Sequence, residues 1–198
     1  MEQLSQMFLQ FIDSYGYIAV AVLMAMENAC IPVPSELILG FAGYLIFAGQ
    51  MTFTGAMIAG MVGGMLGSIF AYAVGSTGGR AFVDKYGKYF LIKKSHVDLA
   101  QDWFDKYGIR AVFFSRMLPV VRTFISLPAG FARVNFSAFL FYTFAGSLPW
   151  TALILYAGMA LGANWKYLLE IGHEASIGFV IICAIILVVW YLRKRRKK

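Results

Sequence analysis

Long apolar runs are the feature that most restricts the fold of this chain. Two of them, 53–74 and 137–161, are long enough to cross a bilayer as helices, since one crossing takes about 20 residues. A third run covers 176–191. Of the 198 residues, 60% are hydrophobic and only 14% are charged, whereas a soluble domain is about a quarter charged. So small a globule could not hide this much apolar surface, so the sequence predicts an all-α integral membrane protein.

Positive charge is concentrated at the carboxyl end of the chain. The tail 193–198 reads RKRRKK and directly follows an apolar run. The positive-inside rule explains such a tail more simply than nucleic-acid binding does, so we expect a cytoplasmic tail and no nucleic-acid partner. The remainder, 1–192, is expected to form a single multi-pass membrane domain.

Two other apolar segments are interrupted by proline and by charge. The first segment follows the apolar run 8–31 and contains PVPSELILGFAG at 32–43. The second segment contains PVVRTFISLPAG at 119–130. These two stretches share five residues at matching positions, opening with Pro-Val and closing with Ala-Gly. Proline removes a backbone hydrogen bond, and irregular backbone at membrane depth must be buried in protein or line a cavity. We therefore expect re-entrant helical hairpins over about 30–50 and 109–132, broken by Pro32, Pro34, Pro119 and Pro128.

Counting crossings back from a cytoplasmic tail makes these hairpins enter the membrane from opposite faces. Residues 76 and 135 then lie inside, and residue 53 lies outside. That pattern predicts an inverted repeat whose tips meet near the midplane of the bilayer. Because 8–31 is counted as one crossing, the N-terminus is expected in the cytoplasm. The segment over about 80–108 is charged and aromatic, which predicts an amphipathic helix at the membrane surface.

Four charged residues lie close to the interrupting prolines: Glu27, Glu36, Arg116 and Arg122. An ionisable group at membrane depth costs about 2.5–3.5 kcal/mol and marks a functional site by default. A guanidinium matches the oxygens of a phosphate, so Arg116 and Arg122 are expected to bind a substrate phosphate. A carboxylate can take up a proton, so Glu27 and Glu36 are expected to be charge partners and proton carriers. Two buried salt bridges that only hold the hairpins together are the structural alternative.

Three stretches resemble the signature regions of the DedA family, also called SNARE-associated or VTT-domain proteins. They read ENACIPVPSE at 27–36, FFSRMLPVVRTFISLPAGFARVNFSAF at 113–139 and GSLPW at 146–150. The resemblance implies lipid transport across a bacterial plasma membrane, opposed re-entrant hairpins and dependence on the proton-motive force. It puts the family's acidic pair at Glu27 and Glu36, and its arginine pair at Arg116 and Arg122. Glu36 stands where some members have aspartate.

The length and basic tail are similar to those of Gram-positive family members that recycle undecaprenyl phosphate. We therefore expect a proton-coupled flippase that returns this lipid from the outer to the inner leaflet for cell-envelope synthesis. The alternatives are a transporter or scramblase of phosphatidylethanolamine or other phospholipids, and an ion-homeostasis protein. A lipid phosphatase, and an enzyme in general, is disfavoured because His96 and His173 lie outside the charged hairpins. We expect no catalytic residues, no cofactor and no metal site, and the glycine-rich run 53–74 would allow a homodimer.

Overall fold

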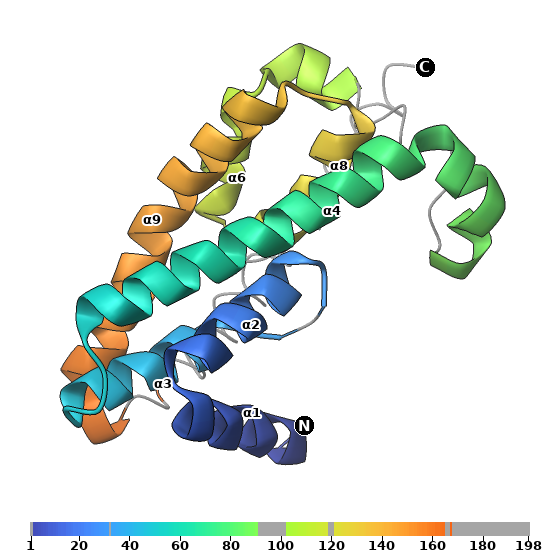
Figure 1. Ribbon diagram of the computed structural model, residues 1–198. Helices are drawn as coiled ribbons and strands as arrows, with labels where there is room; N and C mark the ends of the chain where they lie inside the picture. Colours follow the sequence, from blue (N-terminus) through green and yellow to red (C-terminus); the bar gives the residue numbers. More distant parts are fainter. Residues whose placement is uncertain (1, 32, 91–101, 119–120, 165–166, 168–198) are drawn as a thin grey trace, which may run out of the picture.

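The computed structural model describes the chain except for residues 1, 32, 91–101, 119–120, 165–166 and 168–198. Throughout the described residues the regular structure is helical, without a β-strand (Figure 1). This confirms the predicted all-α class. The expected third run at 176–191, the tail 193–198, Pro32 and Pro119 lie outside the described residues.

The described helices fall into two long ones and several short ones. In chain order they are α1 (Glu2–Tyr15), α2 (Tyr17–Asn28), α3 (Ser35–Phe47), α4 (Phe53–Phe90), α6 (Arg110–Arg116), α7 (Val121–Phe124), α8 (Ser126–Phe131), α9 (Phe136–Leu161) and the 3-10 turn η1 (Gly162–Asn164).

The two long helices, α4 and α9, form the frame of the molecule. Their apolar parts, Phe53–Thr77 and Phe136–Asn164, contain 25 and 29 residues and are long and apolar enough to cross a membrane. At 1.5 Å per residue each exceeds the bilayer core of about 30 Å. The two helices are antiparallel, because Gly60 lies against Thr151 while the Tyr72 and Phe139 rings stack at the other end.

The apolar run 8–31, which we expected to cross the membrane once, is not one continuous helix. Gly16 separates α1 from α2 with a φ of 56°, a conformation that glycine adopts at little cost. In α1, Phe8 and Ile12 are buried and Asp13 is exposed, so this helix is amphipathic. The 12 residues of α2 span about 18 Å, too short to cross the bilayer core of about 30 Å.

Helix α2 packs parallel to α4 through glycine. A Cβ atom on Gly63 would lie 2.7 Å from the carbonyl carbon of Ala21, and Gly67 faces Ala25 in the same way. Only a residue without a side chain permits this approach of two backbones. These glycines of α4 are therefore used inside the monomer, and they give no support to the homodimer that the glycine-rich run would allow.

Helix α3 packs on the other long helix. A Cβ atom on Gly43 would lie 2.8 Å from the Cα atom of Gly158, and the Phe47 ring lies against Gly162. Helix α3 thus runs parallel to α9, and because α9 opposes α4, it runs antiparallel to α2. The α2–α3 pair is a helical hairpin that lies along both long helices (Figure 1). This pair, which is the first broken segment in the structure, covers 17–47 and so begins earlier than the expected hairpin over about 30–50.

The second broken segment, α6 to α8, makes the corresponding pair of contacts in the second half of the chain. The stem of Arg116 in α6 lies on Gly146 of α9, where a Cβ atom would be 2.8 Å from Arg116 Cβ. In α8, Gly130 lies on Gly75 of α4, where a Cβ atom would be 2.9 Å from Gly75 Cα. Each broken segment therefore places one helix on each long helix.

The tips of the two broken segments touch each other. The Cys30 thiol, just after α2, donates a hydrogen bond to the Thr123 carbonyl in α7 at 3.6 Å. The two segments enter the helix frame from opposite ends and meet between α4 and α9 (Figure 1).

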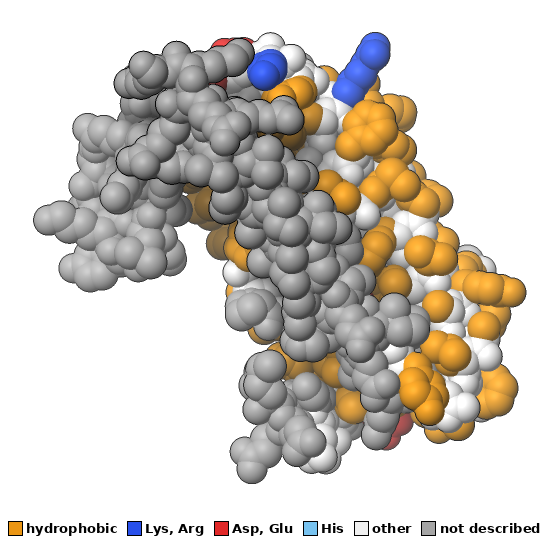
Figure 2. All heavy atoms as spheres, turned by 180° about the vertical axis from the view of Figure 1, so that it is seen from behind, with side chains coloured by type: hydrophobic (Ala, Val, Ile, Leu, Met, Phe, Trp, Pro, Cys, Tyr) orange, Lys and Arg blue, Asp and Glu red, His pale blue; other side chains and the backbone are white. Residues whose placement is uncertain are grey.

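The outer surface of the described residues is strongly apolar. Along α4, four large side chains at steps of four residues are at least half exposed: Ile58, Val62, Leu66 and Phe70. Figure 2 shows hydrophobic side chains over much of the described face and Lys or Arg side chains at its upper end. A soluble monomer rarely exposes a continuous apolar surface of this kind, whereas a lipid environment favours it.

The segment expected to be amphipathic, about 80–108, is helical in its described parts up to Tyr107. Helix α4 continues to Phe90, and residues 102–107 are again helical. In this second part Phe104 is buried in the same hydrophobic cluster as Val112, whereas Lys106 is exposed. Residues 91–101 of this segment lie outside the described residues.

Candidate functional site

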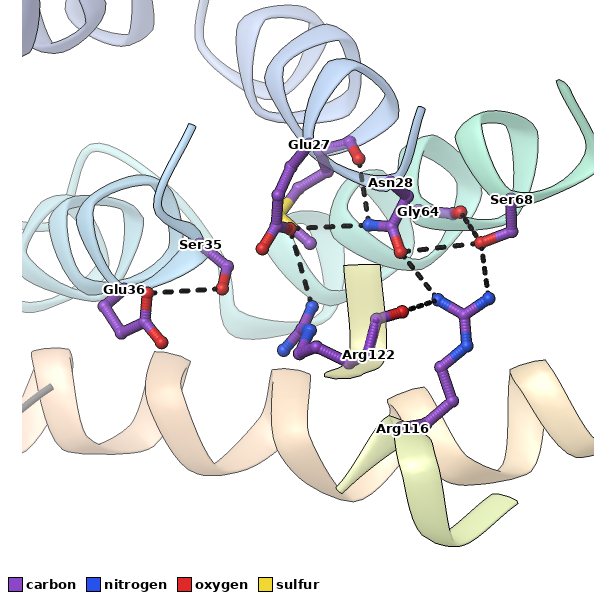
Figure 3. A network of polar contacts seen from close by, with 9 residues as sticks. Glu27, Asn28, Ser35, Glu36, Gly64, Ser68, Arg116 and Arg122 are labelled. Atoms are coloured by element: carbon purple, nitrogen blue, oxygen red, sulfur yellow. Dashed lines mark hydrogen bonds and ion pairs between the residues drawn. The ribbon is translucent and has the colours of Figure 1, made fainter. Parts of the chain in front are cut away.

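Three of the four predicted charged residues converge where the tips of the broken segments meet. Glu27 lies at the end of α2, Arg116 at the end of α6 and Arg122 in α7. Their exposed fractions are only 4%, 1% and 2%, respectively. Figure 3 shows the Glu27 carboxylate facing the Arg122 guanidinium, with Arg116 beside them. The fold therefore buries three of the four charged residues and brings them together where the two tips meet.

Arg116 lies at the centre of a dense hydrogen-bond network. Its Nη1 donates to Asn28 Oδ1 and to the Arg122 carbonyl, both at 2.8 Å. Its Nη2 donates to Ser68 Oγ at 2.9 Å and to Ser126 Oγ at 2.6 Å, with Thr143 Oγ1 at 3.5 Å. Five helices therefore contribute groups around a single guanidinium.

Arg122 has a looser environment than Arg116. Its Nη2 lies 3.6 Å from Glu27 Oε2, longer than the 2.7–2.9 Å that is usual for a charge-assisted hydrogen bond. Its Nη1 is buried and has no hydrogen-bond partner among the described residues. Its guanidinium carbon lies 5.2 Å from the centre of the Trp150 ring, within the range of a cation–π interaction.

Asn28 connects the two arginines. Its Oδ1 accepts hydrogen bonds from Arg116 and, at 3.4 Å, from Ser68. Its Nδ2 donates to the Met24 carbonyl at 3.0 Å and to Glu27 Oε2 at 3.4 Å. The carboxylate that pairs with Arg122 is thus held by the amide that Arg116 orients (Figure 3).

The second predicted acid, Glu36, lies apart from both arginines. It belongs to the first turn of α3 and is partly exposed, and its Oε2 accepts a hydrogen bond from Ser35 at 3.5 Å. Among the described residues, the ion pair at this site joins Glu27 and Arg122 and does not include Glu36. The two acids therefore occupy different environments.

Two of the four predicted helix-breaking prolines can be placed. Pro34 directly precedes α3 in an extended conformation, with φ −69° and ψ 123°. Pro128 is the third residue of α8, within the first turn, where a missing N–H costs no intrahelical hydrogen bond. Pro32 and Pro119 lie outside the described residues.

Sequence reasoning missed the neutral members of the site: Asn28, Ser68, Ser126, Thr143 and Trp150. The first four are at most 2% exposed. The available signal was a hydrogen-bonding side chain inside an apolar run, because a buried polar group is nearly always paired. Single serines and threonines are common in such runs, however, and only the folded chain shows which of them meet.

The cluster is suited to an anionic ligand. With Arg116, Arg122 and Glu27 ionised, two positive charges and one negative charge leave a net charge of +1 in a buried place. Burying an unbalanced charge is costly, so an anion that reaches Arg122 would compensate it.

The chain is similar to known proteins over most of its length. The model of the VTT domain matches residues 33–160. The chain is 39% identical over 188 residues to undecaprenyl phosphate transporter A of Bacillus subtilis, covering 95% of this chain and 93% of that protein. It is 30% identical over 201 residues to undecaprenyl phosphate transporter A of Staphylococcus aureus, covering 98% and 99%.

Another relative has a different kind of name. An alkaline phosphatase-like protein of Lactococcus lactis subsp. lactis is 33% identical over 190 residues, covering 93% of this chain and 89% of that protein. No solved structure matches the chain. The domain model matches most of the chain, and relatives at 39% and 30% identity that are named undecaprenyl phosphate transporter A match it over almost their whole length, so the chain belongs to the VTT-domain (DedA) family of membrane proteins.

Proposed function

We propose that this protein carries undecaprenyl phosphate from the outer to the inner leaflet of the bacterial plasma membrane and that the movement is coupled to protons. One observation carries the proposal: Arg122 is buried, pairs loosely with Glu27 at 3.6 Å and keeps a donor without a partner among the described residues. A phosphate oxygen is the kind of acceptor that this donor lacks. The names of the Bacillus and Staphylococcus relatives, both undecaprenyl phosphate transporters, support the choice of lipid.

The proposed cycle exchanges one anion for another at Arg122. The lipid phosphate competes with the Glu27 carboxylate for the guanidinium, and protonation of Glu27 removes the competing charge. Arg116 adds positive charge to the site. In this cycle Glu36, which is partly exposed, exchanges protons between Glu27 and water.

We propose that the two broken segments are re-entrant hairpins of an inverted repeat within one membrane domain, 1–192. Two observations support this proposal. The first helix of one segment packs on α4 and that of the other on α9, with the last helix of each on the remaining long helix, and the tips of the two segments touch. With the tail inside, the first segment opens to the outside and the second to the cytoplasm.

This arrangement revises the expected position of the N-terminus. The Tyr17 hydroxyl at the start of α2 accepts a hydrogen bond from the Thr52 N–H, just before α4, at 2.8 Å. The start of α2 therefore lies at the end of the frame where α4 begins. Because α2 belongs to the hairpin, this proposal puts α1 and the N-terminus on the outer surface instead of in the cytoplasm.

Reconstitution in liposomes tests the transport proposal. Undecaprenyl phosphate added to one leaflet should move to the other in an imposed proton gradient, whereas phosphatidylethanolamine should not compete with it. Arg122→Gln should abolish this movement, and Arg133→Gln, at an exposed position, should leave it intact. Equal movement of phosphatidylethanolamine would favour the general phospholipid alternative. Release of inorganic phosphate would instead favour the activity suggested by the name of the Lactococcus relative.

A further inference from the structure

The two arginines differ in the number of donors that they have left for a ligand. The two Nη atoms of Arg116 carry four hydrogens, and four hydrogen bonds of 2.6–2.9 Å to protein oxygens use all of them. A phosphate could bind these atoms only by breaking bonds that are already short. The Arg116 Nε has no partner among the described residues, but the stem beside it is packed against Gly146.

Arg122 and Trp150 have the opposite property. The Nη1 of Arg122 and the Nε1 of Trp150 are both buried donors without a hydrogen-bond partner among the described residues. They belong to side chains in direct contact, with the guanidinium carbon 5.2 Å from the centre of the indole ring. An unpaired buried donor is unfavourable, so two at one place indicate a site that is completed by an acceptor.

We propose that Arg122 and Trp150 together bind the anionic headgroup and that Arg116 is a positioning residue that acts through Arg122. This inference rests on the proposed function and assigns a ligand-binding role to Trp150. The Trp150 indole provides both an N–H donor for a phosphate oxygen and an aromatic face for the guanidinium.

The contacts of Arg116 explain how it positions Arg122. Its Nη1 bonds to the Arg122 carbonyl and to Asn28, so it fixes the backbone of α7 against the end of α2. Its Nη2 anchors the same unit to Ser68 of α4 and Ser126 of α8. Helix α7 has only four residues and cannot hold Arg122 in place by itself.

Equilibrium binding to the purified full-length protein tests the role of Trp150. The probe is farnesyl phosphate, with farnesol as the uncharged counterpart, and the heat of binding is measured by titration calorimetry. Trp150→Phe keeps an aromatic ring and removes the N–H, so it should weaken farnesyl phosphate binding by about tenfold. Trp103→Phe, a matched change at a tryptophan of the 102–107 helix, should leave the affinity unchanged.

A double-mutant cycle separates positioning from direct contact. Arg116→Lys and the milder Asn28→Ala should each weaken binding about five- to tenfold in the wild-type background. In the Arg122→Gln background each change should lower the affinity for farnesyl phosphate by less than about twofold, because the residue through which Arg116 and Asn28 act is gone. If either variant lost as much affinity in that background as in the wild type, Arg116 would contact the headgroup directly and the inference would be wrong.

The outcomes distinguish this inference from the proposed function. Farnesol binding as tight as farnesyl phosphate would contradict recognition of the phosphate, and with it the proposed function. Phosphate-dependent binding that survives Trp150→Phe unchanged would leave the proposed function standing and overturn the role of Trp150. Because Arg116→Lys could unfold the site, each variant is compared by size-exclusion chromatography, and Asn28→Ala gives the same test with a smaller change.

Discussion

Single residues decide how this site differs from a structural salt bridge. If the ion pair only stabilised the fold, both arginines would be expected to be saturated with partners, since a broken buried pair is strongly destabilising. Arg116 meets that expectation at its Nη atoms, whereas Arg122 does not. A purely structural role, in which the charges only hold the two hairpins together, therefore fits Arg116 better than Arg122.

Replacing Glu27 with glutamine tests its proposed role as proton carrier. Glutamine has nearly the same shape and cannot change charge, so phosphate binding at Arg122 should no longer compete with a carboxylate. We expect tighter lipid binding and a transport rate that no longer varies with pH. The rate is measured in liposomes between pH 5 and 8, with Asp13→Asn, an exposed acid of α1, as the control. A wild-type pH profile in Glu27→Gln would reject the role.

Ser126→Ala tests the stability of the Arg116 network. The change removes the acceptor of a 2.6 Å hydrogen bond and leaves a buried, charged donor unpaired. We expect a loss of about 1–3 kcal/mol in the free energy of unfolding. Thermal unfolding in detergent measures it, and Ser137→Ala, an exposed serine of α9, should have little effect. Equal midpoints for the two variants would show that the network contributes little to stability.

At the scale of the elements, glycine pairs let short helices lie directly on long ones. Gly43 meets Gly158 and Gly130 meets Gly75, so both broken segments use the same kind of crossing. Gly43 and Gly130 are also the residues that close the two matching stretches of the sequence repeat. The repeat seen in the sequence therefore corresponds to equivalent packing positions.

Alanine at these crossings should separate the helices. At Gly43 the new Cβ would lie 2.5 Å from the Leu155 carbonyl oxygen, and Gly130→Ala meets a similar obstacle of backbone atoms. Overpacking of this kind costs about 1–3 kcal/mol, which should lower the thermal midpoint of each variant. Gly64→Ala is the matched control, because its Cβ would make an ordinary contact of 3.4 Å with Asn28. A midpoint for Gly43→Ala equal to that of Gly64→Ala would contradict the close crossing.

Sequence reasoning predicted elements well where hydrophobicity and length alone decide them. The run 137–161 became α9 nearly as expected, and the run 53–74 became the first part of α4, which continues to Phe90. It missed the break at Gly16, because a single glycine inside an apolar run is compatible with a continuous helix at a cost of only about 1 kcal/mol. Whether the helix continues is decided by how α1 and α2 pack on α3, and those contacts are not visible in the local sequence.

At the scale of the whole molecule, the charges could be found from the sequence but their pairing could not. Charge at membrane depth is unfavourable enough to identify Glu27, Glu36, Arg116 and Arg122 without a structure. Their partners depend on which tips meet, so the separation of Glu36 from both arginines appears only in the fold. The neutral network around Arg116 depends in the same way on contacts between residues as far as 88 positions apart.

The proposed topology makes a prediction for the whole chain that labelling with a membrane-impermeant maleimide can test. In a variant without native cysteines, Gln10→Cys in α1 and Gln50→Cys before α4 should both react in intact cells, because the proposal puts α1 and the opening of the first hairpin outside. Lys106→Cys, at the opposite end of the frame, should react only after permeabilisation. All three positions are exposed, so accessibility within the protein does not limit the reaction.

If Gln10→Cys reacts only after permeabilisation while Gln50→Cys reacts in intact cells, α1 and α2 must cross the membrane and the first hairpin cannot include α2. If Gln50→Cys and Lys106→Cys react from the same side, α4 does not span the membrane and the inverted repeat is wrong.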